Sequence, residues 1–419
     1  MKCMSKKCIV VNGGNALNGS VEVRGAKNAV LPLLAVSILT EEDVIIENCP
    51  NISDIENMVH ILEELGARVT RENSSIRVCG SVTRGCAEAR LYKTMRSSMF
   101  MLGALLSVLG EVEMPTPGGC AIGARPLDIH LDGLKRMGAH AYFDGEILKC
   151  KAERLYGADI IMRYPSVGAT ENLLMCASLA EGNTTLVNCA REPEIVAIAH
   201  ALKAMGAKIS GEGTSVMRIE GVKELHGAML KPCGDRIVAG TVLSATALCG
   251  GDVTVYGVNA NDLRSVIQAF CDEHCDVREN GVGLRIRSDG YIKAKSIITA
   301  PFPLFPTDMQ PQFLACQCFS DGVSRVQETV FENRFAHAAE LSKLGADISV
   351  DGNCATVVGG ELHSGDVYAT DLRAGAGLCV ACMKINGESR VFNPDYIDRG
   401  YENFVGLFSS LGINISLQN

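Results

Sequence analysis

The sequence predicts an α/β fold of the α+β kind, with two domains that each contain three repeats of about 70 residues. Three observations lead to this prediction. One phrase recurs six times along the chain, and a second phrase is interleaved with it. The chain, at 419 residues, is also longer than the size at which one hydrophobic core usually keeps growing.

The first phrase is the end of an amphipathic helix, a glycine and the start of a strand. It reads LEELGARV, LKRMGAHA, LKAMGAKI, LSKLGADI and LFSSLGINI around Gly66, Gly138, Gly206, Gly345 and Gly412. Each glycine stands where a left-handed helix cap is expected. A sixth copy, FCDEHCDV, has His274 in this place and lacks that cap, which we interpret as local divergence and not as a site.

The second phrase is a helix of small apolar residues, a polar turn and an alternating strand, as in LLMCASLAEGNTTLVN and LSATALCGGDVTVYG. A helix that is apolar on nearly all sides must be buried, so we expect these helices to lie inside the sheets. Cys316, Cys318, Cys379 and Cys382 fall in copies of this helix. Packing therefore explains them better than a metal site, because no second CxxC or histidine stands at ligand spacing.

Composition and charge exclude several classes of protein. The net charge of −9 argues against nucleic acid or an anionic membrane surface as partner, because both need a positive surface. The N-terminus does not read as a signal peptide, and apolar runs such as residues 99–110 are too short to span a bilayer. Together with 18 cysteines, these features predict a cytoplasmic protein with reduced thiols.

Three candidate site segments occur in the first third of the chain. Lys27 and Asn28 precede a buried helix, where they suit an anion, although a solvated lysine is the simpler interpretation. Arg96 begins an apolar helix, so its guanidinium must reach water, pair or bind. Cys120 lies near Arg125 in a loop with three glycines and three prolines, which suits a reactive thiol on a lid or an exposed thiol without function.

Further candidates follow in the rest of the chain. Ser166, Gly168 and Thr170 precede a buried helix, as a phosphate-binding turn or an ordinary N-cap would. Asp308 follows three prolines and is either an N-cap or a rigidly held base. Isolated arginines in this acidic chain indicate that it binds a small, multiply charged anion between its domains; they are Arg334, Arg373 and Arg399.

Nine motifs carry a resemblance that covers nearly the whole chain. In order they are GAKNA, MRSS, GGCAIGARPLD, PSVGAT, AREPEI, FPTDMQ, ENRF, DLRAG and IDRGYE. With them the chain resembles the UDP-N-acetylglucosamine 1-carboxyvinyltransferase family of enolpyruvyl transferases, and the cysteine loop and FPTDMQ are the most specific. The resemblance implies an inside-out α/β barrel of two domains, residues 1–21 with 235–419 and residues 22–234, with the active site in the cleft.

The resemblance also implies a reaction. The enolpyruvyl group of phosphoenolpyruvate would pass to the 3-hydroxyl of UDP-N-acetylglucosamine by addition and elimination, through a tetrahedral intermediate, with release of phosphate. This reaction is the committed step toward peptidoglycan, and so serves cell wall biogenesis, cell shape, the cell cycle and cell division. It requires no metal and no other cofactor, and the sequence predicts no oligomeric state.

Site roles follow from the same resemblance, residue by residue. Cys120 would be the general acid and the target of fosfomycin, Asp308 the base, and Lys27 and Arg399 catalytic cations. Phosphoenolpyruvate would contact Lys27, Asn28, Arg96, Arg125, Arg334, Arg373 and Arg399. UDP-N-acetylglucosamine would contact Asn28, Arg96, Arg125, Pro126, Leu127, Asp128, Ile129, Ser166, Val167, Gly168, Asp308 and Val330.

The chain departs from the family pattern at two positions. Tyr164 stands where many relatives have a lysine near the diphosphate, with Arg163 beside it, and Ala104 stands where relatives often have proline. Two alternatives remain from the sequence. One is an enzyme like 5-enolpyruvylshikimate-3-phosphate synthase, which lacks the cysteine loop, and the other is a non-catalytic protein that binds a UDP-sugar.

Overall fold

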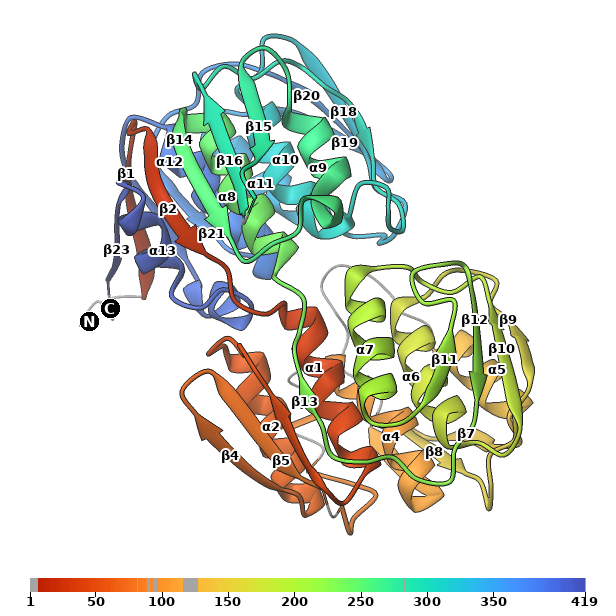
Figure 1. The fold of residues 1–419 in the computed structure, drawn as a ribbon. Helices are drawn as coiled ribbons and strands as arrows, with labels where there is room; N and C mark the ends of the chain where they lie inside the picture. The colour runs from red at the N-terminus through yellow and green to blue at the C-terminus, as the bar shows by residue number, and fades with distance from the viewer. Residues whose placement is uncertain are drawn as a thin grey trace, which may run out of the picture. The chain divides into compact units, whose positions relative to one another are not determined.

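The structure is a computed structural model that describes residues 7–80, 82–88, 91–92, 96–115, 127–281 and 283–418. The chain divides into two compact units. Residues 7–24 and 234–418 belong to the first unit, and the described residues from 25 to 233 belong to the second (Figure 1).

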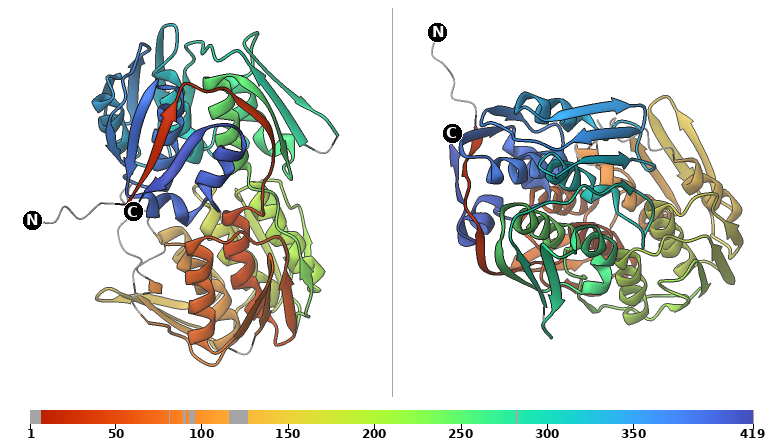
Figure 2. Two further views of the ribbon diagram at one scale, coloured as in Figure 1. Left: turned by 90° about the vertical axis from the view of Figure 1, so that its left-hand side faces the viewer. Right: turned by 90° about the horizontal axis from the view of Figure 1, so that it is seen from above.

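The first unit has three four-stranded sheets, in the orders β21-β22-β1-β23, β15-β16-β14-β2 and β17-β18-β20-β19. One edge pair of each sheet is parallel and its other pairs are antiparallel. The two ends of the described chain meet in one sheet, because β1 pairs with β23 (Figure 2). The strands are β1 Cys8–Gly13, β2 Leu17–Glu22, β14 Gly251–Tyr256, β15 Cys275–Glu279, β16 Gly283–Ser288, β17 Ile297–Ile298, β18 Val323–Gln327, β19 Asp347–Asp351, β20 Cys354–Val358, β21 Asp366–Tyr368, β22 Gly387–Phe392 and β23 Asn414–Gln418.

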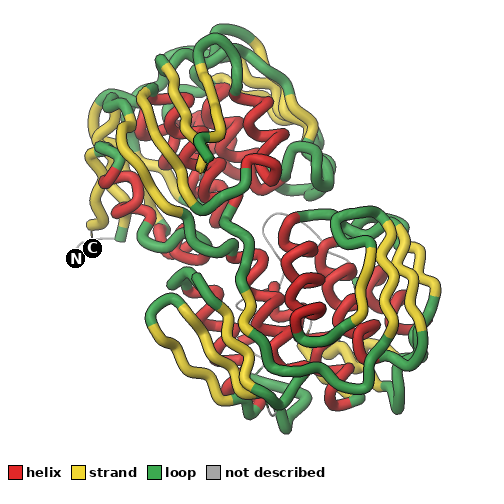
Figure 3. The backbone as a smooth tube through the Cα atoms, in the orientation of Figure 1, coloured by secondary structure: helices red, strands yellow, loops and turns green. Residues whose placement is uncertain are grey.

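Helices of small apolar residues fill the interior of the first unit (Figure 3). Cys316, Cys379 and Cys382 are completely buried within them. Gly377 permits the close packing of two of these helices, because a Cβ there would lie 2.9 Å from the backbone of Pro311. The helices are α8 Arg236–Cys249, η3 Ala260–Leu263, α9 Arg264–Phe270, η4 Thr307–Met309, α10 Gln310–Gln317, α11 Ala336–Lys343, α12 Leu372–Lys384, η5 Pro394–Arg399 and α13 Phe404–Ser410.

The second unit has a similar plan, with the sheet orders β13-β3-β5-β4, β11-β12-β10-β9 and β6-β8-β7. Among the described residues, the last of these sheets has three strands, and its pairs are antiparallel. Its strands are β3 Asp43–Ile46, β4 Arg68–Glu72, β5 Ser75–Cys79, β6 Glu111–Pro115, β7 His140–Asp144, β8 Ile147–Lys151, β9 Asp159–Ile161, β10 Asn183–Val187, β11 Lys208–Ser210, β12 Val216–Glu220 and β13 Met229–Leu230. Its helices are α1 Lys27–Val36, η1 Ser37–Leu39, α2 Ser53–Leu65, η2 Arg96–Phe100, α4 Met101–Leu109, α5 Asp128–Arg136, α6 Val167–Leu179 and α7 Pro193–Ala204.

Two interior helices of the second unit, α4 and α6, approach closely at Gly103. The backbone N–H of Gly103 donates to Oδ1 of Asn172 at 2.5 Å, and a Cβ on Gly103 would lie 2.6 Å from the Asn172 carbonyl oxygen. Only glycine fits this contact. Ala104, where relatives often have proline, is completely buried beside it.

The repeat interpretation is confirmed by the backbone. Gly66, Gly138, Gly206, Gly345 and Gly412 all have φ between 93° and 108°, and a strand follows each of them. In the sixth copy α9 ends at Phe270, and Cys271 after it is extended. His274 instead pairs through Nδ1 with Oδ2 of Asp289 at 2.8 Å, just before β15.

The predicted α+β class and the placement of apolar helices inside sheets are therefore confirmed. Among the described residues, no helix is both long and apolar enough to cross a membrane.

Candidate active site

One acidic and two basic side chains meet in the first unit, and we call them the Asp308 cluster: Asp308, Arg334 and Arg373. Nη2 of Arg334 lies 3.0 Å from Oδ1 of Asp308, and Nη2 of Arg373 lies 3.2 Å from Oδ2. The exposed fractions of the side chains are 27% for Asp308, 2% for Arg334 and 5% for Arg373. Two of the three arginines predicted from sequence as isolated cations, Arg334 and Arg373, thus share one carboxylate.

Neighbouring side chains hold the two arginines in place. Asp371 caps α12, because its Oδ1 accepts the N–H groups of Arg373 at 2.9 Å and Ala374 at 3.1 Å. The guanidinium of Arg373 lies 5.7 Å from the ring centroid of Tyr401, and that of Arg334 lies 5.4 Å from the ring centroid of Phe331.

The Asp308 cluster holds two guanidinium groups and one carboxylate, and the carboxylates of Asp235 and Asp371 also act on this region. Burial alone would lower the pKa of Arg373, but the carboxylate of Asp308, together with Tyr401 and Asp235, outweighs burial, and the pKa is raised. Burial lowers the pKa of His337 to about 4, so this imidazole near Arg334 is neutral at pH 7. The three side chains of the Asp308 cluster themselves carry one more positive than negative charge. Nε of Arg334 and Nη1 of Arg373 find no hydrogen-bond acceptor in the described part of the chain.

The sequence left open whether Asp308 is an N-cap or a rigidly held base, and the structure does not place it at an N-cap position. It lies in the middle of η4, a short 3₁₀ helix after the extended residue Pro306. The hydroxyl of Thr307 donates to Oε2 of Glu328 at 2.8 Å, and the backbone N–H of Val330 donates to Oε1 of the same residue at 2.8 Å. Buried Glu328 thus ties η4 to the loop that contains half-buried Val330.

Arg399 is the last residue of η5 and is half-buried. This short helix packs against α12, the helix that carries Arg373 in its first turn. Tyr401 follows it and contacts Arg373, as described above. The Arg399 segment is therefore joined to the Asp308 cluster through α12.

Lys27 and Asn28 are the first two residues of α1 and do not precede it, which corrects the prediction. Ala26 before them is extended and ends the preceding segment. Nζ of Lys27 lies 2.5 Å from Oδ2 of Asp54, with side-chain exposures of 10% and 2%. A solvated lysine was the simpler interpretation of the sequence, and it is wrong. Asn28 is half-buried.

The N-termini of α5 and α6 lie together in the second unit. Ser166 caps α6, because its Oγ accepts the N–H of Ala169 at 3.3 Å. Gly168 and Thr170 lie inside the helix and not ahead of it, which corrects the prediction, and half-buried Val167 begins it. A Cβ on Gly168 would lie 3.2 Å from Cε1 of His130 on α5.

Asp128 begins α5 and forms an ion pair with Arg163. The hydrogen bond from Arg163 holds the pKa of Asp128 below its usual range. Oδ1 of Asp128 also accepts the N–H of Ile129 at 2.9 Å, and half-buried Leu127 precedes it. The predicted uridine and diphosphate segments therefore neighbour each other, and Arg163 is a cation at the point where Tyr164 replaces a lysine.

The side chains of four predicted site residues lie outside what the structure describes. Cys120, Arg125 and Pro126 lie outside the described residues. Arg96 begins η2, but its side chain lies outside what the structure describes.

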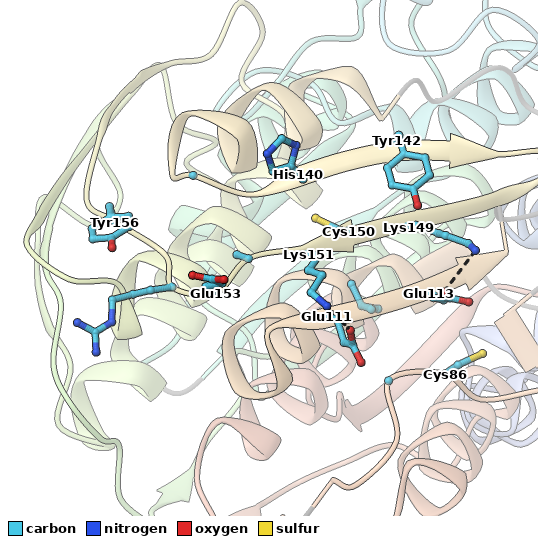
Figure 4. Close-up of a pocket in the computed structure, with 15 residues that line it drawn as sticks. Cys86, Glu111, Glu113, His140, Tyr142, Lys149, Cys150, Lys151, Glu153 and Tyr156 are labelled. Carbon is cyan, nitrogen blue, oxygen red and sulfur yellow. Dashed lines mark hydrogen bonds and ion pairs between the residues drawn. The ribbon is translucent and has the colours of Figure 1, made fainter.

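A surface hollow of about 820 Å³ lies elsewhere in the second unit, over β6, β7 and β8 (Figure 4). Several of its charges pair with each other: Lys149 lies 3.5 Å from Glu113, and Lys151 lies 3.2 Å from Glu111. None of the predicted site residues lines it. We do not assign the reaction to this hollow.

Sequence reasoning missed several residues that position the candidates. Asp54, Glu328, Asp371 and Tyr401 each contact a predicted residue or fix its segment. Asp371 stands directly before a helix in the sequence, which is a recognisable N-cap signal. The other three carry no local signal, because their partners are distant in the chain.

Comparison with known proteins agrees with the resemblance seen in the sequence. A curated relative from Magnetococcus marinus, named UDP-N-acetylglucosamine 1-carboxyvinyltransferase, is 43% identical over 411 residues, which are 97% of this chain and 98% of the relative. The solved structure of the enolpyruvyl transferase NikO from Streptomyces tendae aligns with a TM-score of 0.89, at 24% identity and over 99% of both chains. EPSP synthase from Acinetobacter baumannii aligns with a TM-score of 0.73, at 17% identity, over 99% of this chain and 100% of that one.

These structures show the fold alone, and they confirm the predicted inside-out α/β fold. The sequence model of the family described as EPSP synthase (3-phosphoshikimate 1-carboxyvinyltransferase) matches residues 11–408. The chain is therefore an enzyme that belongs to this family of enolpyruvyl transferases.

Proposed function

We propose that this enzyme transfers the enolpyruvyl group of phosphoenolpyruvate to the 3-hydroxyl of UDP-N-acetylglucosamine and releases phosphate. The observation that carries the proposal is the Asp308 cluster, a carboxylate beside two buried guanidinium groups. It occurs in a chain that is 43% identical to a relative named for this reaction. The cysteine loop GGCAIGARPLD favours this acceptor over shikimate 3-phosphate.

The reaction needs an acid, a base and fixed cations. A proton adds to the methylene carbon of phosphoenolpyruvate, and the cation-like C2 is attacked by the sugar oxygen, which gives a tetrahedral phosphate ketal. Loss of phosphate and of a methyl proton then restores the double bond. Cys120 supplies the acid, and Asp308 accepts the proton of the sugar hydroxyl.

The cations act on the two anionic groups of phosphoenolpyruvate. Arg334 and Arg373 bind the carboxylate, because guanidinium groups match it in a bidentate manner. Buried positive charges also interact more strongly with charge that develops in a transition state than exposed ones do. The phosphate is bound by Lys27, Arg125 and Arg399, with Arg96 in support.

The nucleotide sugar is bound mainly by the second unit. Asn28 contacts the sugar, and residues 126–129 contact the uridine. Ser166, Val167 and Gly168, at the start of α6, bind the diphosphate, and the N–H groups of Val167 and Gly168 are the backbone donors. Val330, on the loop held by Glu328, contacts the acceptor from the first unit. We infer two functional domains, residues 1–21 with 235–419 and residues 22–234, which both supply site residues.

In the cell, this reaction would take place in the cytoplasm and commit the sugar to peptidoglycan. Cell wall biogenesis, cell shape, the cell cycle and cell division would depend on its product.

The first prediction is the release of inorganic phosphate when the enzyme is incubated with phosphoenolpyruvate and UDP-N-acetylglucosamine together. Either substrate alone should give only background, and shikimate 3-phosphate should be inactive as acceptor. A colorimetric phosphate assay measures the result, and mass spectrometry identifies the product. Release with shikimate 3-phosphate would favour the synthase alternative. A well-folded protein that binds the UDP-sugar without releasing phosphate would favour the non-catalytic alternative.

The second prediction concerns fosfomycin. We expect it to alkylate one thiol, that of Cys120, and we expect Cys120→Ala to abolish the mass increase. Intact-protein and peptide mass spectrometry measure this. Cys271→Ala is the control, since the thiol of Cys271 is exposed. Labelling that persists in Cys120→Ala and disappears in the control would remove Cys120 from the mechanism.

A further inference from the structure

Asp308 is the counter-ion of two buried arginines. Two guanidinium groups with exposures of 2% and 5% need an anion beside them, because a buried charge without a partner is strongly destabilising. The carboxylate of Asp308 fills this need with one contact to each arginine, at 3.0 Å and 3.2 Å.

The two arginines are not saturated by this carboxylate. Arg334 and Arg373 each contact Asp308 through Nη2, whereas a guanidinium can offer a carboxylate two parallel N–H donors. Nε of Arg334 and Nη1 of Arg373 are buried, and no acceptor for them exists among the described atoms. A second carboxylate could therefore make hydrogen bonds with these arginines that Asp308 does not make.

Within the Asp308 cluster, the carboxylate of Asp308 is also the group that an incoming anion can displace most easily. Its side chain is 27% exposed, and it lies in a 3₁₀ helix of three residues. The arginines, in contrast, are buried and fixed by the Asp371 cap and by the rings of Tyr401 and Phe331. An anion that enters the cluster would displace the carboxylate and leave the arginines in place.

We propose that Asp308 is an internal substitute for the substrate carboxylate. When phosphoenolpyruvate binds Arg334 and Arg373 through its carboxylate, Asp308 leaves them and becomes able to accept the proton of the acceptor hydroxyl. This inference rests on the proposed function and adds an order of events to it. A carboxylate between two guanidinium groups is a poor proton acceptor, because their charges favour its ionised form. The base is therefore masked until the substrate whose reaction needs it is present.

The proposal predicts that loss of the base improves binding. In Asp308→Asn no internal carboxylate competes, so phosphoenolpyruvate should bind more tightly although turnover is lost. If the displaced state makes up about a tenth of the wild-type molecules, the gain is on the order of tenfold. Pyruvate, which has the carboxylate but no phosphate, should gain by a similar factor. The affinity for inorganic phosphate should increase much less, because phosphate binds to other cations.

Isothermal titration calorimetry with these three ligands, in the absence of UDP-N-acetylglucosamine, makes the measurement. Asp347→Asn, an exposed carboxylate of the same unit, is the control for a general change of charge and should bind all three ligands like the wild type. Thermal unfolding checks that Asp308→Asn is folded, and Asp308→Ser replaces it if it is not.

Two results would overturn the proposal: no gain for phosphoenolpyruvate and pyruvate, or an equal gain for inorganic phosphate, which indicates a general electrostatic effect. Failure of the proposed function looks different, because the wild-type enzyme would then release no phosphate from its substrates. An active wild type whose Asp308→Asn variant binds pyruvate no more tightly rejects only the inference drawn here.

Discussion

Lys27→Met is expected to lower the free energy of unfolding by about 3–5 kcal/mol, the usual cost of leaving a buried charge without its partner. The partner is Asp54, which lies 2.5 Å from Nζ of Lys27 and is almost completely buried. Turnover should fall as well, by about 10²-fold or more, because a preorganised cation at the transferring group is lost. Urea unfolding measures the first effect, and the phosphate assay measures the second.

A double variant separates the two roles of Lys27. In Lys27→Met with Asp54→Asn no uncompensated charge remains, so most of the lost stability should return while turnover stays low. Lys208→Met is the matched control, since Lys208 pairs with Glu220 on the exposed surface, where an ion pair contributes about 1 kcal/mol or less. If the double variant also regained turnover, Lys27 would have only a structural role.

The sequence predicted those features of the fold that depend on local patterns. The five repeat glycines could be identified because helix periodicity ends beside them and because a left-handed residue is needed there. Their φ angles, between 93° and 108°, reflect this local requirement. The buried helices were predictable in the same way, since α6 and α12 are apolar on almost all sides.

The candidate site was predictable only as a set of residue types. Asp308 and Arg373 are separated by 65 positions, and nothing in either segment indicates that their side chains pair. Asp54 looks like an ordinary acidic residue in the first turn of a helix, but its carboxylate is buried against Lys27. These pairings depend on how distant repeats pack, and that packing could not be inferred from the local patterns of a single sequence.

Glu171→Gln is expected to stabilise the protein at neutral pH. Glu171 is completely buried on α6, and within the described residues neither of its carboxylate oxygens has a hydrogen-bond donor. Burial, and then the negative charges of Glu194 and Glu192, raise its pKa well above the usual value. The folded protein therefore keeps a proton at a pH where the unfolded chain has lost it.

The sign of the pH effect follows from this difference in bound protons. The contribution of Glu171 to the free energy of unfolding is complete below the pKa that this carboxyl has in the unfolded chain. Above that pKa it decreases by about 1.4 kcal/mol per pH unit, until the carboxyl ionises in the folded protein as well. Glutamine has the shape of the protonated acid and does not titrate. Urea unfolding between pH 5 and pH 8 should therefore show that the stability of Glu171→Gln increases relative to that of the wild type as the pH rises. Glu224 is at an exposed position of the same unit, so the free energy of unfolding of Glu224→Gln should change with pH as that of the wild type does. A constant difference between Glu171→Gln and the wild type across this range would mean that Glu171 is ionised in the folded protein, with a cation beside it that compensates its charge.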